Sequence, residues 1–164
     1  MLHHPIDPVY DEHSIILILG SFPSVKSREA EFFYGHPQNR FWKVLAAVLG
    51  QDIPVGVDEK KSFLLRNHIA LWDVIGSCEI TGSADSTIRN VTVNDIGSIL
   101  KKTSIRKIYV NGKTAEKFYN RYLRRNVGVD TICLPSTSPA NASFCLERLI
   151  DVWKCIRLDI SAQE

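Results

Sequence analysis

The sequence lacks long apolar stretches and any cysteine pair at metal-ligand spacing. No apolar run reaches the roughly 18 residues needed to span a bilayer, and the start of the chain, MLHHPIDPVYDEHS, has no basic region followed by an apolar core. The four cysteines form no C-x-x-C motif, which argues against a zinc ribbon or an iron–sulfur cluster. We therefore expect a cytoplasmic protein that is not bound to a membrane. We also expect reduced and mostly buried thiols at Cys78, Cys133, Cys145 and Cys155.

Motifs for nucleotide and metal binding are also missing. The segment GSFPS at 20–24 fits neither the phosphate-binding pattern G-x-x-x-x-G-K-[ST] nor G-x-G-x-x-G, and no G-x-S-x-G elbow occurs. The histidines near the start of the chain, His3, His4 and His13, have no metal-ligand spacing, so we interpret them as solvent-exposed or structural residues. We expect neither a metal nor another cofactor.

The composition that remains is that of an ordinary globular protein. Hydrophobic residues make up 45% and charged residues 23% of the 164 residues, which predicts a single domain over residues 1–164, with residues 1–13 as an N-terminal extension. The formal net charge of +2 does not by itself indicate a nucleic-acid binder. The basic cluster RYLRRN at 121–126 is typical of a solvated helix end, where cations are favoured.

Short apolar runs alternate with helical patterns along the chain. The runs are rich in β-branched residues and end at turn formers, and they cover 14–20, 68–75, 104–112 and 129–136. Helical patterns cover 39–50, 60–68, 92–102, 113–123 and 141–157. We expect a Thr or Asn cap on 92–102, and an apolar stripe at positions 144, 145, 148, 149, 152 and 156 in the last helix. The alternation predicts a three-layer α/β/α fold around a central four-stranded parallel sheet.

The carboxyl ends of the predicted strands mark the expected binding site. In open α/β sheets the ligand lies outside this edge. The residues there are Gly20 to Ser24, Trp72 and Asp73, Asn111 to Lys113, and Leu134 to Pro139. The segment FFYGHPQNRFWKVL at 32–45 follows the first strand and belongs to the same edge.

Backbone amides, hydroxyls, an aromatic ring and a carboxamide at this edge suit a planar heterocycle. A ring can stack on Tyr34 or Phe33 while amide groups pair with its edge. Asn39 cannot serve as a general base, because a carboxamide does not titrate near neutral pH; in an enzyme it would orient water or donate hydrogen bonds to developing charge. The residues alone also allow Asn39 as a helix cap and Tyr34 as a packing residue. We expect Phe41 and Trp42 in the core.

Three segments at this edge resemble the uracil-DNA glycosylase superfamily. They are ILGSFPS at 18–24, YGHPQNRFWKVL at 34–45 and LPSTSPAN at 134–141, and the resemblance covers roughly residues 14–155. The segment HPQNRFWKV is similar to that of bacterial mismatch-specific uracil-DNA and thymine-DNA glycosylases. The resemblance implies a uracil-DNA glycosylase-like fold and an enzyme that flips a base out of DNA before cutting it off.

The first motif departs from the better-known branches at Phe22. The mismatch-specific enzymes carry a catalytic Asn two residues after the glycine of this motif, and the common uracil-DNA glycosylases carry an Asp there. Because phenylalanine can hold no water, the resemblance implies that Asn39 supplies the catalytic polar group. An apolar first motif combined with the Asn of HPQN is similar to the hypoxanthine-DNA glycosylase branch, which removes deaminated adenine. The second motif, LPSTSPAN, replaces the NPSGLS or HPSPLS of other branches.

The resemblance assigns a role to each part of the edge. Asn39 is the predicted catalytic residue of a monofunctional glycosylase, which hydrolyses the N-glycosidic bond and leaves an abasic site. Tyr34 is the predicted stacking residue, and the backbone N–H groups near Ser21 and Phe22 are predicted donors to the leaving base. The predicted base-binding residues are Gly20, Ser21, Phe22, Tyr34, Asp73 and Asn111, and the predicted DNA-binding residues are Pro23, Ser24, Lys113, Ser136, Thr137, Ser138, Pro139, Ala140 and Asn141. The expected partner is DNA that contains a deaminated base, bound by a monomer.

Three other interpretations stay open at this point. The closest one keeps the fold and changes the substrate to uracil or thymine in mismatches. A second, suggested by Phe22, is a non-catalytic nucleic-acid or nucleobase-binding module. A third is a small-molecule α/β enzyme unrelated to DNA, which would show no salt-dependent DNA binding.

Overall fold

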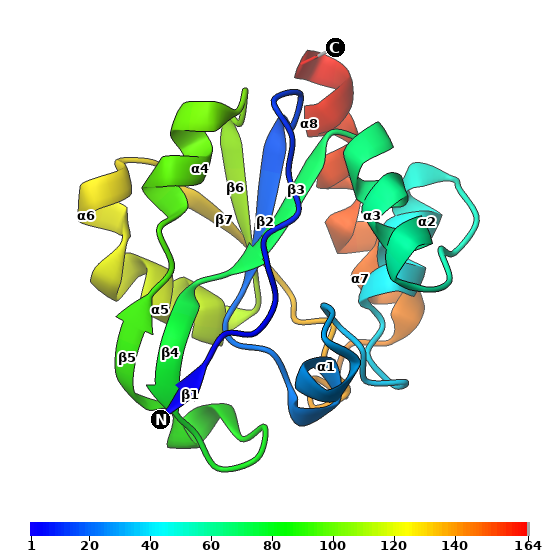
Figure 1. Cartoon of the computed structure of the whole chain (residues 1–164). Helices are drawn as coiled ribbons and strands as arrows, with labels where there is room; N and C mark the ends of the chain where they lie inside the picture. Colours follow the sequence, from blue (N-terminus) through cyan, green and yellow to red (C-terminus); the bar gives the residue numbers. More distant parts are fainter. Residues whose placement is uncertain (164) are drawn as a thin grey trace.

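A four-stranded parallel sheet forms the centre of the computed structural model, which describes residues 1–163 and the side chains of residues 1–161. Its strands are β2 (Ile16–Gly20), β3 (Ile69–Asp73), β6 (Lys107–Asn111) and β7 (Thr131–Leu134). They lie in the order β3-β2-β6-β7, and every neighbouring pair is parallel (Figure 1). The predicted sheet is confirmed, and the carboxyl ends of its strands meet at one edge.

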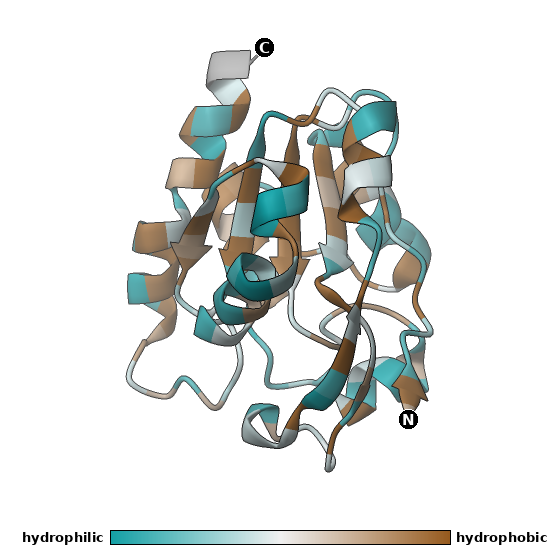
Figure 2. Cartoon of the chain, turned by 90° about the vertical axis from the view of Figure 1, so that its left-hand side faces the viewer, coloured by the Kyte–Doolittle hydropathy of each residue, from teal (hydrophilic) through white to brown (hydrophobic). Residues whose placement is uncertain are grey.

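Helices cover both faces of this sheet, which confirms the three layers (Figure 1). One face carries α2 (Phe41–Leu49), α3 (Val57–Arg66), α7 (Leu146–Trp153) and α8 (Cys155–Gln163), and the other carries α4 (Ile96–Lys102), α5 (Lys113–Tyr122) and α6 (Arg124–Val127). Figure 2 shows apolar residues gathered along the central strands and polar residues on the outer helical turns.

Strand β2 shows how the sequence builds two hydrophobic cores. Successive side chains of a strand point to opposite faces, so Ile16 and Ile18 pack under α2 and α7, whereas Leu17 and Leu19 pack under α5. All four side chains are completely buried. Burial of each one stabilises the fold by about 1.5–3 kcal/mol. The core positions predicted for Phe41 and Trp42 are also confirmed, since these residues are 0% and 6% exposed.

A second sheet, which is antiparallel, is not predicted by the sequence patterns. It consists of β1 (Leu2–His3), β4 (Ile75–Glu79) and β5 (Arg89–Val93) in the order β1-β4-β5. The apolar run at 68–75 contains β3 and the first residue of β4, which only Val74 separates. Residues 1–13, expected as an extension, supply β1, and Val9 pairs with Leu71 of β3. The start of the chain therefore runs alongside β3.

The cap expected on α4 is corrected by the structure. Asp95 caps this helix, because its side chain accepts a hydrogen bond from the backbone N–H of Ser98 at 3.1 Å. Asn94, one of the expected cap residues, instead donates from Nδ2 to the backbone carbonyls of Asp73 and Ile75 at 2.9 and 3.2 Å. This amide ties the end of β3 to the start of β4.

The buried stripe of the last helical segment also differs from the expected one. The segment is divided into α7 and α8, and its buried residues are Leu149, Trp153, Ile156 and Ile160. Val152, expected in the stripe, is 41% exposed. Leu149 and Ile156 are buried as expected, whereas Trp153 and Ile160 lie outside the expected stripe.

The four cysteines are free of disulfide bonds, as expected. Cys78 is buried, Cys133 and Cys155 are half-buried, and Cys145 is exposed, so the expectation of mostly buried thiols is wrong. Within residues 1–163, no helix is long and apolar enough to cross a membrane.

Candidate active site

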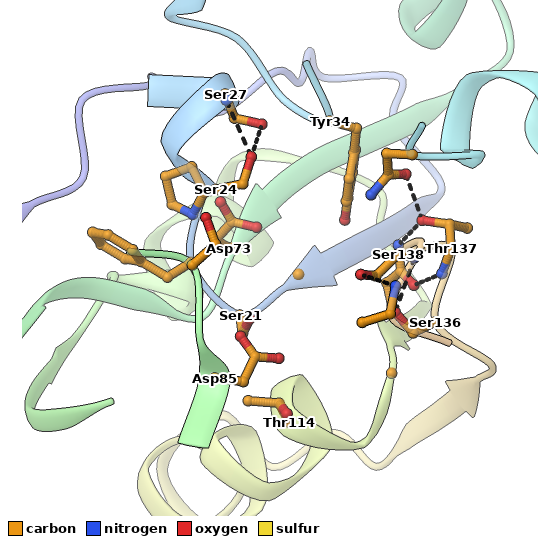
Figure 3. A pocket seen from close by; sticks show the side chains of 18 of the residues that line it. Ser21, Ser24, Ser27, Tyr34, Asp73, Asp85, Thr114, Ser136, Thr137 and Ser138 are labelled. Carbon is orange, nitrogen blue, oxygen red and sulfur yellow. Dashed lines mark hydrogen bonds between the residues drawn. The ribbon is translucent and has the colours of Figure 1, made fainter. Parts of the chain in front are cut away.

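A pocket of about 320 Å³ opens at the carboxyl edge of the central sheet (Figure 3). This volume lies at the small end of the roughly 300–1,000 Å³ that is usual for small-molecule sites. The last residues of β2, β3 and β6 and the segments after β2, β6 and β7 contribute to its wall. Tyr34 and Asn39 join them from the segment before α2. The pocket therefore lies at the edge that the strand pattern predicts.

Most of the predicted site residues belong to this wall. The catalytic candidate Asn39 lines the pocket, as do all the predicted base-binding residues, namely Gly20, Ser21, Phe22, Tyr34, Asp73 and Asn111. The predicted DNA-binding residues that line it are Pro23, Ser24, Lys113, Ser136, Thr137, Ser138 and Ala140. Pro139 and Asn141 lie outside the wall. The structure places these residues together, while their roles stay predictions.

The carboxamide of Asn39 is held in one orientation. Its Oδ1 accepts a hydrogen bond from the backbone N–H of Phe41 at 2.9 Å and another from the hydroxyl of Thr137 at 2.9 Å. A backbone N–H can only donate, so the atom that faces Phe41 must be the oxygen. Asn39 precedes the N-cap residue Arg40 and accepts the first backbone N–H of α2. It still presents Nδ2, which has no hydrogen-bond partner within the described side chains.

Thr137 links Asn39 to Asn111 in a chain of hydrogen bonds whose directions are all determined. The backbone N–H of Thr137 donates to Oδ1 of Asn111 at 3.1 Å, so Nδ2 of Asn111 faces the Thr137 hydroxyl and donates to it at 3.0 Å. The hydroxyl must then donate its own proton to Asn39. Thr137 is completely buried. We therefore expect it to orient Asn39 rather than to contact DNA phosphates with its hydroxyl.

Tyr34 presents one face of its ring to the pocket. The opposite face stacks on Phe41, with ring centroids 4.1 Å apart and an angle of 20° between the planes. The backbone of Tyr34 has a φ of 53°, a left-handed conformation that is uncommon for a residue with a side chain. Such strain is retained where the surrounding structure over-determines it, often at binding sites.

The hydroxyl of Tyr34 is buried and has no hydrogen-bond partner in the part of the chain that the structure describes. Burial and then the nearby Asp73 carboxylate raise the pKa of Tyr34 far above its ordinary value, against a smaller opposing effect of Asn111. The hydroxyl therefore keeps its proton at neutral pH. It is a free donor inside the pocket, which suggests that a ligand atom completes it.

Asp73 places a carboxylate at the floor of the pocket, beside Gly20. Its side chain is 5% exposed, and its Oδ2 lies 2.7 Å from Nε2 of His4. A methyl group built on Gly20 would lie well inside contact distance of Oδ1 of Asp73 and 2.8 Å from the Tyr34 hydroxyl oxygen. Only glycine at position 20 therefore leaves room for these two polar groups to meet at the floor.

Arg40 holds the loop after β7 against the pocket. Its guanidinium donates to the backbone carbonyls of Ser138 and Asn141 at 3.0 and 3.2 Å, and to that of Phe144 as well. The backbone N–H of Arg40 donates to the carbonyl of Thr137 at 3.1 Å. The HPQNR segment thus anchors the second motif while it presents Asn39.

The first motif contributes an apolar wall, as Phe22 predicts. The Phe22 ring is half-buried and packs edge-on against the ring of His4, with centroids 5.9 Å apart. Ser24 caps the short helix α1 (Val25–Ala30), since its side chain accepts from the backbone N–H of Ser27 at 3.1 Å. Position 22 itself therefore offers no polar side chain to the pocket.

Two parts of the site are missed by the sequence patterns. One is His4, whose side chain lies beneath the pocket although the residue stands in the expected extension. The other is the loop between β4 and β5, which adds Ser83, Asp85 and neighbouring residues to the wall on the side away from Tyr34 (Figure 3). Its polar composition is that of any surface loop. No sequence signal ties it to the pocket.

The pocket combines three kinds of polar group around a flat space. Asn39 offers a carboxamide N–H, Tyr34 offers a hydroxyl donor and Asp73 offers a carboxylate acceptor. Among the described residues, no group of three or more His, Cys, Asp or Glu side chains is placed to hold a metal ion. This arrangement can bind a polar heterocycle and stabilise negative charge that develops on it.

The chain matches known proteins over most of its length. A family profile described as "Uracil DNA glycosylase superfamily" matches residues 8–155. A protein of Methanosarcina acetivorans named "Hypoxanthine DNA glycosylase" is 36% identical over 150 residues, which cover 90% of this chain and 94% of that protein. A protein of the same name from Methanosarcina barkeri is 36% identical over 137 residues, which cover 82% and 85% of the two chains.

A solved structure shares the fold as well. It is a solution NMR structure of a protein from Methanosarcina acetivorans, with a TM-score of 0.79 and 33% identity. The match covers 96% of this chain and 99% of that one. This structural match confirms the predicted fold class independently of the strand order.

Proposed function

Because the chain belongs to the uracil DNA glycosylase superfamily, we propose that it is a monofunctional hypoxanthine-DNA glycosylase. It flips a deaminated adenine out of DNA and hydrolyses the N-glycosidic bond, which leaves an abasic site. The observation that carries this proposal is the carboxamide of Asn39, which is locked by two hydrogen bonds and presents a free N–H beside an aromatic face.

Base flipping brings the substrate to the pocket. Flipping costs a few kcal/mol and costs least for a mispaired base, so a deoxyinosine left opposite thymine is easier to extrude than adenine. The flipped hypoxanthine stacks on the face of Tyr34 that Phe41 leaves open. Selectivity thus begins in the duplex and continues in the pocket.

Hydrolysis breaks the bond between C1′ and N9 of the nucleotide. The oxygen of water bonds to C1′, and the electron pair of the broken bond leaves with the base, which a proton from water neutralises. Both acceptor positions of Asn39 Oδ1 are used inside the protein, so this residue acts through Nδ2 as a donor to the leaving base. One such donor is worth about 2.7–4 kcal/mol of transition-state stabilisation.

The rim of the pocket supplies contacts to the DNA backbone. Ser136 and Ser138 keep hydroxyl protons for phosphate oxygens, although their oxygens already accept backbone N–H groups of Ser138 and Ala140. Lys113 is exposed at the start of α5 and suits a phosphate contact. We propose that one monomer binds one lesion without metal or cofactor, and that the protein works in the cytoplasm.

The test is cleavage of an end-labelled duplex that carries one deoxyinosine opposite thymine. After alkaline scission of abasic sites, we expect one product band, and borohydride should trap no covalent intermediate, because the enzyme forms no Schiff base. Matched duplexes with deoxyuridine or a G·T mismatch run in parallel. Uracil release without hypoxanthine release would contradict the proposed substrate, and binding without any cleavage would favour a non-catalytic module.

Substitution of Thr137 by Val should lower the rate of deoxyinosine cleavage by roughly tenfold. Valine keeps the shape but removes the hydroxyl that orients Asn39, and it leaves Nδ2 of Asn111 without its acceptor. Single-turnover rates on the same duplex measure the effect. Thr137→Ser is the matched control, because serine keeps the hydroxyl and should stay within a few-fold of the wild type. Equal rates for Val and Ser would argue against the orienting role.

A further inference from the structure

The side chain of His4 lies beneath the pocket rather than in solvent. It is only 3% exposed, and its Nε2 is 2.7 Å from Oδ2 of Asp73, a residue 69 positions away in the sequence. Strand β1 delivers it there, because Leu2 and His3 pair with Cys78 and Ser77 of β4. The backbone N–H of His4 donates to the carbonyl of Gly76 at 2.8 Å, so the residue is fixed at both backbone and side chain.

The hydrogen bonds determine which ring nitrogen of His4 carries the proton. The backbone N–H of Ile6 donates to Nδ1 at 3.2 Å, so Nδ1 must be an acceptor without a proton. A neutral imidazole then has its proton on Nε2, which donates to Asp73. His4 is thus a neutral donor, and Asp73 is the charged acceptor of the pair.

Asp73 is fixed at its side chain and at its backbone. His4 binds Oδ2, while Nδ2 of Asn94 donates to the backbone carbonyl of Asp73 at 2.9 Å. The other oxygen, Oδ1, is directed to Gly20 at the pocket floor. Oδ1 makes no hydrogen bond with any described residue. A buried carboxylate oxygen is stable when it accepts a hydrogen bond, so a ligand in the pocket should donate an N–H to Oδ1.

We propose that His4 is a positioning residue that fixes Asp73 as the hydrogen-bond acceptor for a ring N–H of the flipped base. This inference rests on the proposed function and adds to it the residue that distinguishes the deaminated base from adenine. Hypoxanthine carries a proton on N1, whereas adenine presents an unprotonated N1 with a lone pair at the same position. An anionic acceptor at this position therefore binds the deaminated base and repels the normal one.

Tyr34 contributes its ring face to the base, and Asp73 meets the edge of the base. Asp73 approaches Gly20 at the pocket floor, whereas the free face of the Tyr34 ring supports the stacked base. The N1–H of hypoxanthine is therefore the group that Asp73 recognises. A site built to bind a substrate N–H can reject the analogue that lacks it by a large factor.

Two substitutions of His4 separate this role from simple packing. His4→Gln keeps an N–H donor the same number of bonds from the backbone, while His4→Phe keeps a flat ring without the donor. We expect kcat/KM on the deoxyinosine duplex to fall about 10- to 100-fold in His4→Phe, as for loss of a hydrogen bond to a charged group, and only a few-fold in His4→Gln. A packing role alone predicts the opposite order, because the ring contacts Phe22, Phe33 and Trp72.

The control variants are His13→Gln and His13→Phe, since His13 is exposed and does not line the pocket. Both should match the wild type. Thermal melting of every variant shows whether a loss of activity follows a loss of folding.

A double-mutant cycle tests whether His4 acts through Asp73. In an Asp73→Ala background, His4→Phe should cause no further loss, because the acceptor that His4 orients is already gone. Equal activity of both His4 variants and the wild type, or independent losses in the cycle, would overturn this inference while the proposed function stands. A wild-type protein that leaves deoxyinosine intact would instead overturn the proposed function, and this inference with it.

Discussion

Replacement of Asn39 by Asp should abolish most of the deoxyinosine cleavage while the protein stays folded. Aspartate keeps an oxygen for the backbone N–H of Phe41 and for the Thr137 hydroxyl, so the start of α2 remains capped. The other carboxylate oxygen replaces Nδ2 and faces the pocket. A donor is thereby exchanged for a negative charge, at the place where negative charge develops on the leaving base.

The expected loss is at least about 100- to 1,000-fold in the single-turnover rate, the range for removal of one transition-state donor. Asn39→Ala should lose activity to a similar degree, and it should also be less stable by about 1 kcal/mol, because the cap is lost. The two variants therefore differ in stability rather than in activity. Rates at saturating enzyme and thermal melting curves provide the two measurements.

The outcome for Asn39→Asp also decides between two mechanisms. If residue 39 used its oxygen to orient the attacking water, aspartate would keep or raise the rate. Activity near the wild-type level in this variant would thus contradict the donor role. Asn120→Asp is the matched control for added charge, because Asn120 is exposed on α5. It should cleave at the wild-type rate.

The sequence predicts the central sheet because local patterns determine it. Residues 14–20 form a continuous apolar run that ends at glycine, and such a run is stable only when both of its faces are covered. The second sheet depends on pairing across the chain. Its strand β1 has two residues and its strand β5 is mostly exposed, so neither has an apolar pattern to detect.

The sequence predicts the positions of some pocket residues but not the contacts that orient them. Asn39 and Tyr34 stand in a distinctive segment at a strand edge, so their place in the wall follows from topology. The contact of His4 with Asp73 joins residues 69 positions apart, and nothing near either residue indicates the other. The orientation of Asn39 likewise depends on Thr137, 98 positions away. Sequence patterns show which groups gather, and the long-range contacts decide what each group does.

In the last helical segment, the sequence predicts an apolar stripe but not which residues of it are buried. Its apolar spacing is correct, but the buried stripe is Leu149, Trp153, Ile156 and Ile160. A helix of this kind offers two overlapping apolar stripes, and packing against α2 selects one of them. The choice comes from the partner surface rather than from the helix itself.

Substitution of Gly20 by Ala should reduce deoxyinosine cleavage by about 100-fold or more and lower the melting temperature. The added methyl group would lie against Oδ1 of Asp73 and 2.8 Å from the Tyr34 hydroxyl oxygen. Neither group can move freely, because His4 holds the carboxylate and Phe41 supports the Tyr34 ring. Overpacking of this kind typically costs about 1–3 kcal/mol of stability.

The loss of activity should exceed what the loss of stability explains. A displacement of about 1 Å in groups that position a substrate can lower a rate about 100-fold, and here the methyl group displaces the Asp73 carboxylate and the Tyr34 ring together. The measurement is the single-turnover rate at a temperature where the variant is fully folded. Gly97→Ala in α4 is the matched control, because a methyl group there meets no atom closer than 3.8 Å. It should keep full activity, with equal or higher stability, since alanine favours helices. Wild-type activity in Gly20→Ala would mean that the positions of Asp73 and Tyr34 at this floor do not matter for recognition of the base.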